Sequence, residues 1–452
     1  MWVDDTFPAT TSSMFFDAKE LEEEIHWKRP QDLSTNSVLA KMDNYSLPMQ
    51  GNLGNCWLIC AFYALAKSET VWNKVFEFCE FDISNSDYKG KIIIQLWVNG
   101  VWEKITIDDR LPTIYKDGQY KLIYGSCNDS SQFWAPLLEK ACAKLYGCYE
   151  SLISGRVSEG FLLVTGGYTW CEEVSNGITK MEYLLARIKL INKSRNKYGT
   201  QDSNVFVSCD KALTTDTKNI LTQELHCYAL VELDDTNIGS IKVKIWNPWQ
   251  SSSGAKSSNS CVNVFLEDLI EFRPRVTYTT TDLNCILNVF NQSIYQNFIS
   301  EKLVYGEWRA LCTSGGTRQS NTFHENPQIY ISLKNNSNIH GILHVTLFQV
   351  SKRNSSKRKF LEQAIGLHIF NADSKPSCRL SLQQINSLNS IFSTKPEYEY
   401  SQNRSSLVSF QFNDNAPNHF ILVPSTFSTN INCNFLLRII SCSSIDECKV
   451  LS

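Results

Sequence analysis

The sequence predicts an α+β protein in which a mixed N-terminal part, built of helices and strands, precedes an antiparallel β-sandwich. Three observations predict this fold class. The apolar run Trp57–Leu65 contains no Pro or Gly, as a buried helix would require. The strand-like runs Ile92–Val98 and Val101–Ile107 flank the turn Asn99-Gly100, which is typical of a β-hairpin. From about Val276, short strand-like runs alternate with Asn, Ser, Gly and Pro turns, which favours a sandwich.

The length and composition indicate a soluble, globular, multidomain protein. The chain has 452 residues, too many for one hydrophobic core, and its net charge of −3 gives no support for nucleic acid or an anionic membrane as the main partner. No apolar run is long enough for a transmembrane helix, and the first residues lack the pattern of a signal peptide. The 16 cysteines include no Cys-x-x-Cys pair. We therefore expect a reducing, cytoplasmic environment rather than a disulfide framework or a zinc site.

The other elements follow from periodicity and from helix-ending residues. Apolar residues recur at helical spacing from Phe133 to Leu145, and Gly147 ends that helix. Met181–Ile191 is periodic enough for a further helix, and Ser251–Ser260 is a polar loop. Strands are predicted at Val205–Ser208, Cys227–Leu233 and Ile241–Trp246, and in the sandwich at Gln328–Leu333, Gly341–Val350, Ala364–Phe370, Ser406–Phe412, Phe420–Pro424 and Asn434–Ser441.

A glycine-bearing passage beginning near Gly155 marks the boundary between two lobes of the N-terminal part. We expect an N-terminal arm over residues 1–27, a first lobe over 28–156, a β-rich second lobe over 157–276 and the sandwich over 277–452. No repeat of fixed period, coiled-coil heptad or Asp-rich calcium loop interrupts this order.

Cys56 is the candidate nucleophile. It follows a polar loop that begins at Gln50, and it lies in the first turn of the predicted Trp57–Leu65 helix. There, unpaired N–H groups and the positive end of the helix dipole favour a thiolate. The Gln50 amide could curl back beside the sulfur and, with the Cys56 N–H, bind a developing oxyanion. A lone cysteine is more often a buried structural residue, but the Gln, Gly, Gly, Cys, Trp arrangement favours the nucleophile.

A nucleophilic thiol needs an imidazole and a group that orients it. Of the 7 histidines, only His226 lies in the β-rich lobe, at the head of a predicted strand. A hairpin would bring Asn247 beside it, and Trp249 could shield their hydrogen bond from water. Taken singly, His226 reads as a core histidine and Asn247 as a turn residue before Pro. Their joint position at strand ends in one lobe favours a catalytic pair.

Further short motifs accompany these residues. They are Gln50-Gly51-x-x-Gly54-x-Cys56-Trp57, Phe133-Trp134 with Leu138-Glu139-Lys140-Ala141, Gly147-Cys148-Tyr149-Glu150, Glu159-Gly160-Phe161, Thr165-Gly166-Gly167, His226-x-Tyr228 and Asn247-Pro248-Trp249. As an ensemble they resemble the calpain protease core, a two-lobed, papain-like cysteine protease fold.

The resemblance continues downstream and covers nearly the whole chain. Gly306-Glu307-Trp308, Asn321-Thr322-Phe323, Asn326-Pro327-Gln328, Ala364-Ile365-Gly366, Val423-Pro424-Ser425-Thr426-Phe427 and Phe435-Leu436-Leu437-Arg438 resemble the β-sandwich, domain III, that follows the core in calpains. Phe7-Pro8-Ala9-Thr10, Trp27-Lys28-Arg29-Pro30 and Gly54-Asn55-Cys56 are similar to atypical calpains that lack a penta-EF-hand domain.

The resemblance implies a reaction and a set of roles. Cys56 would be the nucleophile, His226 the general base and acid, Asn247 the orienting residue and Gln50 the oxyanion donor. The expected site also includes Trp57, Gly155 and Trp249, which would support the substrate cleft. The implied function is an intracellular cysteine endopeptidase that makes limited cuts in protein substrates by acyl transfer.

The calcium sites typical of calpain cores are altered in this sequence. Positions that usually carry carboxylates hold Leu47 and Gln132 at one site, and Ser253 lies in the segment of the other. Calcium prefers several oxygen ligands, usually with carboxylates among them, so we expect no metal ligand set here and a reduced calcium dependence. No acidic loop stands around Lys334–His340, so membrane association through the sandwich has no support.

Two departures keep a second interpretation open. Leu225 replaces the glycine that usually precedes the catalytic histidine, and of a paired glycine only Gly155 remains, next to Ser154. With the altered calcium positions, these changes suit a catalytically weak or inactive calpain homologue that acts as a scaffold or binding protein. The presence of all four chemical residues favours the active protease.

Overall fold

A computed structural model describes residues 1–17, 23–41, 45–173, 185–186, 188–189, 203–209, 226–234, 241–249, 261–271, 275–281, 300–334, 341–350, 363–395, 405–412, 418–441 and 443–452. The chain forms two compact units that divide between Phe290 and Asn291. Each unit is described by itself below. The predicted limits of the arm and of the two lobes stay predictions.

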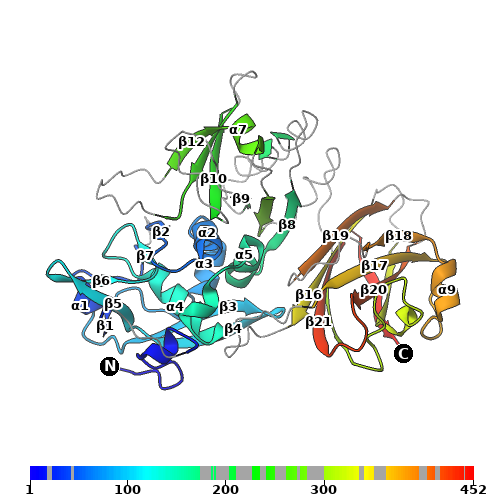
Figure 1. The fold of residues 1–452 in the computed structure, drawn as a ribbon, viewed down its shortest axis with the longest axis horizontal. Helices are drawn as coiled ribbons and strands as arrows, with labels where there is room; N and C mark the ends of the chain where they lie inside the picture. The colour runs from blue at the N-terminus through cyan, green and yellow to red at the C-terminus, as the bar shows by residue number, and fades with distance from the viewer. Residues whose placement is uncertain are drawn as a thin grey trace. The chain divides into compact units, whose positions relative to one another are not determined.

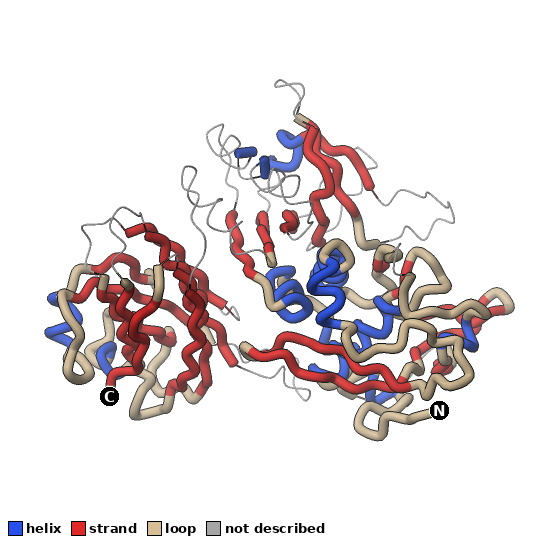
Figure 2. Tube along the Cα trace, turned by 180° about the vertical axis from the view of Figure 1, so that it is seen from behind, coloured by secondary structure: helices blue, strands red, loops and turns tan. Residues whose placement is uncertain are grey.

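The first unit begins with a helical part (Figures 1 and 2). Its helices are α1 (Pro30–Leu33), α2 (Cys56–Leu65), α3 (Glu69–Val75), α4 (Trp134–Tyr146) and α5 (Val157–Thr165), with 3-10 turns η1 (Thr11–Ser13) and η2 (Tyr149–Leu152). Every residue of α2 after Cys56 is buried, because this helix is apolar on all sides. The helices predicted after Cys56 and from Phe133 are confirmed, and Gly147 ends α4 with a φ of 104°.

Short strands flank these helices. The hairpin β3 (Lys91–Val98) and β4 (Val101–Asp108) is confirmed, and its turn residues Asn99 and Gly100 both have positive φ, as a tight hairpin turn requires. A three-stranded sheet of order β1-β5-β6 and the pair β2-β7 complete this part. Their bounds are β1 (Ile25–Lys28), β2 (Pro48–Met49), β5 (Leu111–Lys116), β6 (Gln119–Leu122) and β7 (Ser126–Cys127).

A six-stranded antiparallel sheet follows, in the order β12-β11-β10-β9-β13-β8. Its strands are β8 (Tyr168–Glu173), β9 (Ser203–Cys209), β10 (His226–Asp234), β11 (Lys242–Trp246), β12 (Cys261–Phe265) and β13 (Arg275–Thr280), and α7 (Leu266–Glu271) follows β12. The strands predicted at the positions of β9, β10 and β11 are confirmed. The predicted helix Met181–Ile191 lies largely, and the loop Ser251–Ser260 entirely, outside the described residues.

One hydrophobic core joins the helical part to the six-stranded sheet. Phe206 of β9, Cys227 and Ala229 of β10, and Trp246 of β11 belong to the same buried cluster as α2. The rings of Tyr63 and Trp246 stack with their centroids 4.6 Å apart. The start of β10 is therefore held against α2 by packing of buried side chains.

The second unit consists of two antiparallel sheets, as the sequence predicts. One has the order β14-β21-β16-β19 and the other β18-β17-β20-β15-β22. The strands are β14 (Ser300–Trp308), β15 (Gln328–Leu333), β16 (Gly341–Val350), β17 (Ile365–Ala372), β18 (Ser390–Ser393), β19 (Ser405–Phe412), β20 (His419–Thr426), β21 (Cys433–Ser441) and β22 (Ile445–Leu451), with η3 (Phe323–Glu325) and α9 (Leu382–Ser387). Buried residues of both sheets, such as Val345, Leu437, Ile331 and Leu367, form a common core.

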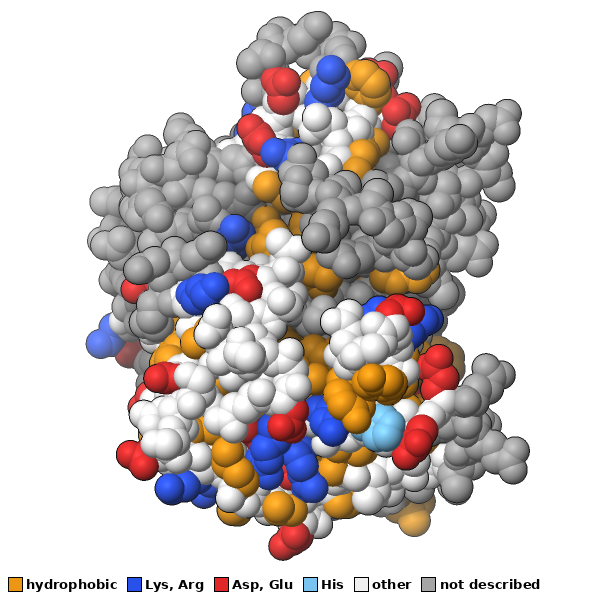
Figure 3. All heavy atoms as spheres, turned by 90° about the vertical axis from the view of Figure 1, so that its left-hand side faces the viewer, with side chains coloured by type: hydrophobic (Ala, Val, Ile, Leu, Met, Phe, Trp, Pro, Cys, Tyr) orange, Lys and Arg blue, Asp and Glu red, His pale blue; other side chains and the backbone are white. Residues whose placement is uncertain are grey.

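The described surface carries charges of both signs. In Figure 3 acidic and basic side chains lie close to one another over the described part of that face, in keeping with the small net charge. Among the described residues, no helix combines the length and the apolar character needed to cross a bilayer.

Candidate active site

Cys56 is the first residue of α2. Asn55 precedes it as the N-cap, and the Asn55 carbonyl accepts the N–H groups of Leu58 at 2.9 Å and Ile59 at 3.2 Å. The Cys56 side chain is half-buried, unlike the fully buried residues that follow it. The helix therefore presents one thiol at its N-terminal end, with backbone N–H groups around the sulfur.

Burial raises the pKa of the Cys56 thiol to about 12, and the neighbouring thiol of Cys227 adds to this effect. The backbone N–H groups of Cys227, Trp57 and Cys56 act in the opposite direction. One turn along α2, the Cys60 thiol donates to the Cys227 carbonyl at 3.5 Å. Helix α2 thus contacts the residue next to His226. At neutral pH Cys56 carries its proton, so a nucleophilic role for this thiol would require a base.

His226 and Asn247 are directly bonded. His226 is the first residue of β10, Asn247 follows β11, and these two strands pair as an antiparallel hairpin. The distance from His226 Nε2 to Asn247 Oδ1 is 2.8 Å. The Trp249 N–H donates to the same Oδ1 at 3.0 Å, which identifies that atom as the amide oxygen. Since an oxygen accepts, Nε2 carries the imidazole proton and Nδ1 keeps its lone pair.

The environment of His226 favours the neutral ring. Only 5% of the residue is exposed, and burial lowers the pKa of the imidazole, while the bond to Asn247 works against this shift. The Tyr228 ring lies edge-on at 4.7 Å and the Trp249 ring at 6.5 Å from the imidazole. Trp249 is 46% exposed, so its indole is in part open to solvent.

Gln50 is connected to the histidine side of the site through its backbone. Its N–H donates to the Pro248 carbonyl at 2.9 Å, in a parallel bridge with Trp249. Its side-chain Nε2 donates to the Leu53 carbonyl at 2.7 Å, while Oε1 is buried without a partner. The amide therefore bonds within its own loop, and the second Nε2 hydrogen is the one that could meet an oxyanion.

Trp57 and Gly155 contact each other closely. The Trp57 indole N–H donates to the Leu152 carbonyl at 2.9 Å. A Cβ added at Gly155 would lie 2.5 Å from Cε2 of that indole. No larger residue fits at position 155 unless the tryptophan beside Cys56 moves.

The structure also brings Glu139 of α4 to this site, a residue that sequence reasoning noted only as part of a motif. Its carboxylate accepts the Asn55 Nδ2 at 2.7 Å and the Gly125 N–H at 2.8 Å. Burial raises the pKa of Glu139 to about 7, although both hydrogen bonds oppose the shift. A glutamate within an apolar helix could have indicated this role, because a buried carboxylate requires specific hydrogen-bond donors.

Leu47 and Gln132, at two of the positions that usually carry calcium ligands, make other interactions. Leu47 packs against the hydrophobic core. The Gln132 Oε1 accepts the N–H groups of Lys41 at 3.3 Å and Ser46 at 3.1 Å, and the Lys41 ammonium pairs with Asp129 at 2.6 Å. Within the described ranges, no group of three or more His, Cys, Asp or Glu side chains could hold a metal ion. Leu225 and Ser253 lie outside the described residues.

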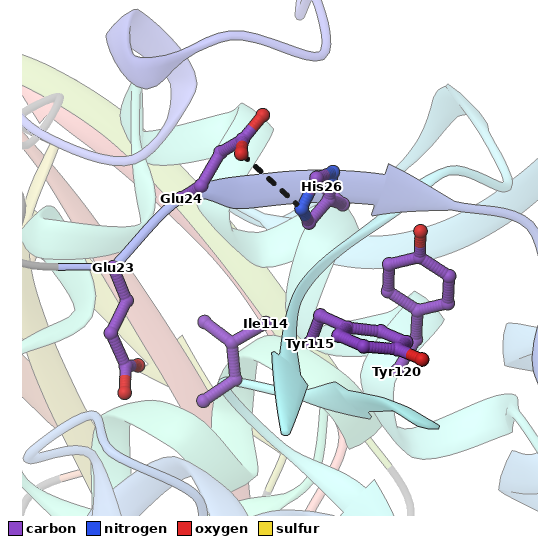
Figure 4. A pocket seen from close by; sticks show the side chains of 6 residues that line it. All are labelled: Glu23, Glu24, His26, Ile114, Tyr115 and Tyr120. Carbon is purple, nitrogen blue, oxygen red and sulfur yellow. Dashed lines mark ion pairs between the residues drawn. The ribbon is translucent and has the colours of Figure 1, made fainter. Parts of the chain in front are cut away.

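A surface pocket of about 410 Å³ lies on the β1-β5-β6 sheet (Figure 4). It is lined by Glu23, Glu24, His26, Ile114, Tyr115 and Tyr120, and Glu24 approaches His26 to 3.9 Å. None of the predicted site residues lines it, so it is separate from the Cys56 site.

Comparison with known proteins bears on the identity of the whole chain. The family described as calpain family cysteine protease matches residues 2–261, and the one described as calpain large subunit, domain III matches residues 304–440. Calpain-10 of Rattus norvegicus is 25% identical over 98% of this chain and 71% of its own length. The calpain of Schistosoma mansoni is 26% identical over 99% of this chain and 61% of its own length.

The calpain-2 catalytic subunit of Rattus norvegicus is 28% identical over 98% of this chain, which spans 66% of that relative's length. The chain thus spans about two thirds of the length of these relatives. The match to the protease family alone covers more than half of the sequence. The chain belongs to the calpain family of cysteine proteases.

Proposed function

We propose that this chain is a cysteine endopeptidase that makes limited cuts in intracellular protein substrates, with Cys56 as nucleophile and His226 as general base and acid. The observation that carries the proposal is the bond from His226 Nε2 to Asn247 Oδ1, 2.8 Å long, at the end of a strand packed on α2. This bond leaves the Nδ1 lone pair as the proton acceptor that a buried thiol requires.

The reaction follows from the ionisation states. Cys56 is protonated and His226 neutral, so His226 Nδ1 takes the thiol proton as the sulfur attacks the peptide carbonyl. The Cys56 N–H and the Gln50 amide stabilise the oxyanion. The imidazolium, oriented by Asn247, then gives its proton to the leaving amine. A water molecule, deprotonated by the same nitrogen, hydrolyses the thioester and restores the thiol.

The helical part and the six-stranded sheet correspond in this proposal to the two lobes of a papain-like cleft, with the substrate extended between them. We also propose that bringing Cys56 and His226 together does not depend on calcium at the Leu47 and Gln132 positions. An apolar side chain, an amide already bonded to two N–H groups and the Lys41 ammonium form a poor environment for a divalent cation.

Cleavage of a denatured protein substrate tests the proposal. The wild-type chain is expected to produce discrete fragments, and Cys56→Ser and His226→Ala to abolish them. Cys79→Ser is a matched control, because Cys79 is also half-buried with a thiol pKa of about 12 but lies against Ile93, outside the site. No cleavage by the wild-type chain, or cleavage that survives Cys56→Ser, would favour the scaffold interpretation.

A further inference from the structure

Glu139 connects the residue before the nucleophile to the segment that supports the Gln50 loop. It is 1% exposed, and its two oxygens accept one donor each. Oε1 accepts the side-chain amide of Asn55 at 2.7 Å, and Oε2 accepts the backbone N–H of Gly125 at 2.8 Å. Both hydrogen bonds are buried, where a bond to a carboxylate is short, directional and strong.

The segment around Gly125 carries the loop between Gln50 and Cys56. The Asn52 N–H donates to the Ile123 carbonyl at 2.9 Å. A Cβ added at Gly51 would lie 2.2 Å from the Tyr124 carbonyl oxygen, so backbone touches backbone here. A Cβ at Gly125 would lie 3.0 Å from Glu139 Oε2, so the carboxylate is close-packed on that segment as well.

Asn55 transmits this restraint to the nucleophile. It is fully buried and is the N-cap of α2, yet its side chain caps no N–H of the helix. Its carbonyl instead accepts the N–H groups of Leu58 and Ile59, so its backbone sets where the helix begins. The Cys56 sulfur projects from the next residue, and a rotation of Asn55 would move it.

We propose that Glu139 is a positioning residue of the peptidase site, whose ionised carboxylate holds Asn55, and with it the Cys56 sulfur, in register with the Gln50 loop. The inference rests on the proposed function for the meaning of Cys56, but its test does not. Two acceptors facing two donors satisfy all four atoms, whereas a protonated carboxyl would present one of those donors with an O–H.

Ionisation of Glu139 provides the readout. Glu139 belongs to a cluster of ionisable groups linked by electrostatic interactions. The other members of this cluster are Tyr124, Tyr149, Glu150, Cys148, Asp108 and Cys142. The two tyrosines, stacked at 4.5 Å, have pKa values raised by burial, so they stay neutral near pH 7. Burial raises the pKa of Glu139 to about 7, so this carboxyl changes charge between pH 6 and 8.

The experiment measures alkylation of Cys56 by iodoacetamide, read by mass spectrometry, in the wild-type chain and in Glu139→Gln between pH 5.5 and 8.5. The glutamine has one acceptor and one donor, so it imitates the protonated acid at every pH. Thiol ionisation cancels in the ratio of the two rates. At pH 8 we expect Cys56 of the variant to react about tenfold more slowly than Cys56 of the wild type, because one buried charge-assisted hydrogen bond is worth about that factor. Below pH 6 the ratio of the wild-type rate to the variant rate should approach one, because Glu139 is then protonated.

Thermal unfolding separates positioning from a structural role. Because the folded-state pKa of Glu139 is raised, ionising it destabilises the fold as pH rises toward 7, and glutamine removes that penalty. Glu139→Gln should therefore unfold at a temperature no lower than the wild type at pH 8 while its Cys56 reacts more slowly. A loss of both stability and reactivity would assign Glu139 a structural role and overturn the proposal.

Two further variants sharpen the result. Glu150→Gln is the matched control, because Glu150 is a buried carboxylate of the same unit that accepts the Phe16 N–H at 3.0 Å. The ratio of the wild-type alkylation rate to the Glu150→Gln rate should not vary with pH. In an Asn55→Ala background, Glu139→Gln should slow alkylation less than twofold, since the transmitting amide is gone. A pH-independent ratio, or additive effects of the two substitutions, would contradict the proposal. Absence of peptide cleavage by the wild type would instead refute the proposed function and leave this comparison intact.

Discussion

At the residue scale, the site consists of a neutral thiol and a neutral imidazole. Burial raises the pKa of Cys56 to about 12 and lowers that of His226. A preformed thiolate–imidazolium pair would require the opposite shifts. In the proposed mechanism, proton transfer therefore accompanies attack on the substrate, with neutral His226 as the base at any pH above its lowered pKa.

The first prediction concerns the pH dependence of that thiol. Because the thiolate fraction of a group with a pKa near 12 rises tenfold for each pH unit, alkylation of Cys56 by iodoacetamide should rise about tenfold per unit between pH 7 and 9. Stopped-time alkylation followed by mass spectrometry measures it, with Cys79 as the internal control. A plateau already reached at pH 7 would show that alkylation does not proceed through a free thiolate with a pKa near 12, and would contradict this prediction.

Asn247→Ala tests the orientation of the imidazole. The variant loses the acceptor that fixes Nε2 as the protonated nitrogen, so the ring is free to take the wrong tautomer or turn away. We expect kcat to fall by about tenfold to a hundredfold, less than the loss in His226→Ala, with KM nearly unchanged. Steady-state kinetics on a peptide substrate would decide, and a change confined to KM would assign Asn247 to substrate binding instead.

Sequence reasoning predicts Cys56, His226 and Asn247 at helix and strand ends because such ends can be read from local pattern, and the structure has them there, while their catalytic roles stay predictions. It noted Glu139 only as part of a motif, because nothing in the local sequence shows that this acid faces Asn55 and Gly125. Nor could it foresee that Gln50 Nε2 would bond to the Leu53 carbonyl, since that choice depends on the exact path of the loop.

At the element scale, α4 is fixed to β4 by a buried ion cluster. Asp108 Oδ1 pairs with the Lys140 ammonium at 2.5 Å, and Oδ2 with Arg110 at 2.6 Å, while neither Asp108 nor Lys140 is exposed. Burial raises the pKa of Asp108, but the Lys140 charge and the hydrogen bonds from Arg110 and Lys140 outweigh it and bring the pKa to about 2.

Asp108→Asn should therefore destabilise the first unit strongly. It leaves the Lys140 ammonium buried without its counter-ion, which costs about 3–5 kcal/mol of unfolding free energy. Urea unfolding at pH 7 measures the change. Asp117→Asn, which breaks an exposed pair with Lys121, is the control and should leave stability unaltered.

The pH dependence of the same cluster has a defined sign. Because the folded-state pKa of Asp108 is depressed to about 2 from 3.8, its contribution is present above pH 4 and is lost as pH falls toward 2. The difference in stability between wild type and Asp108→Asn should therefore shrink over this range. A difference that stays constant from pH 7 to pH 2 would show that the cluster contributes through packing alone.

Some observed helices and strands were not predicted from the sequence, for physical reasons. Helix α5 includes Gly160, which reads as a helix breaker, but a Cβ there would lie 3.1 Å from Ala61, so close packing on α2 outweighs the weak helix propensity. Strand β14 lacks a clear alternation of buried and exposed residues. By contrast, β15 and β16 were predicted at their observed bounds because turn residues flank them.

At the scale of the whole molecule, each unit has its own hydrophobic core, and the sequence pattern predicts both units. The change to short strands with frequent turns distinguishes the two sheets of the second unit from the helices of the first. What the sequence could not give is the order of strands in the six-stranded sheet, where β13 lies between β8 and β9. That order depends on long-range pairing, which local pattern does not encode.

The behaviour of the whole chain toward calcium gives a further prediction. Because Leu47 and Gln132 occupy expected ligand positions, and the Lys41 ammonium pairs with Asp129 beside Gln132, a chelator should leave the rate of substrate cleavage within about twofold of the rate in calcium. Isothermal titration calorimetry of the full chain checks binding independently of activity. Two micromolar calcium sites within residues 28–276 would overturn the expectation of reduced calcium dependence.

The central claim is that the chain carries out acyl transfer with Cys56 activated by His226, and labelling by a peptidyl electrophile tests it most directly. Incubation of the full chain with a peptidyl fluoromethyl ketone should modify Cys56 selectively among the 16 cysteines, and His226→Ala should lose that adduct. Labelling spread over the exposed cysteines, or an adduct at Cys56 that forms equally fast in His226→Ala, would contradict the account.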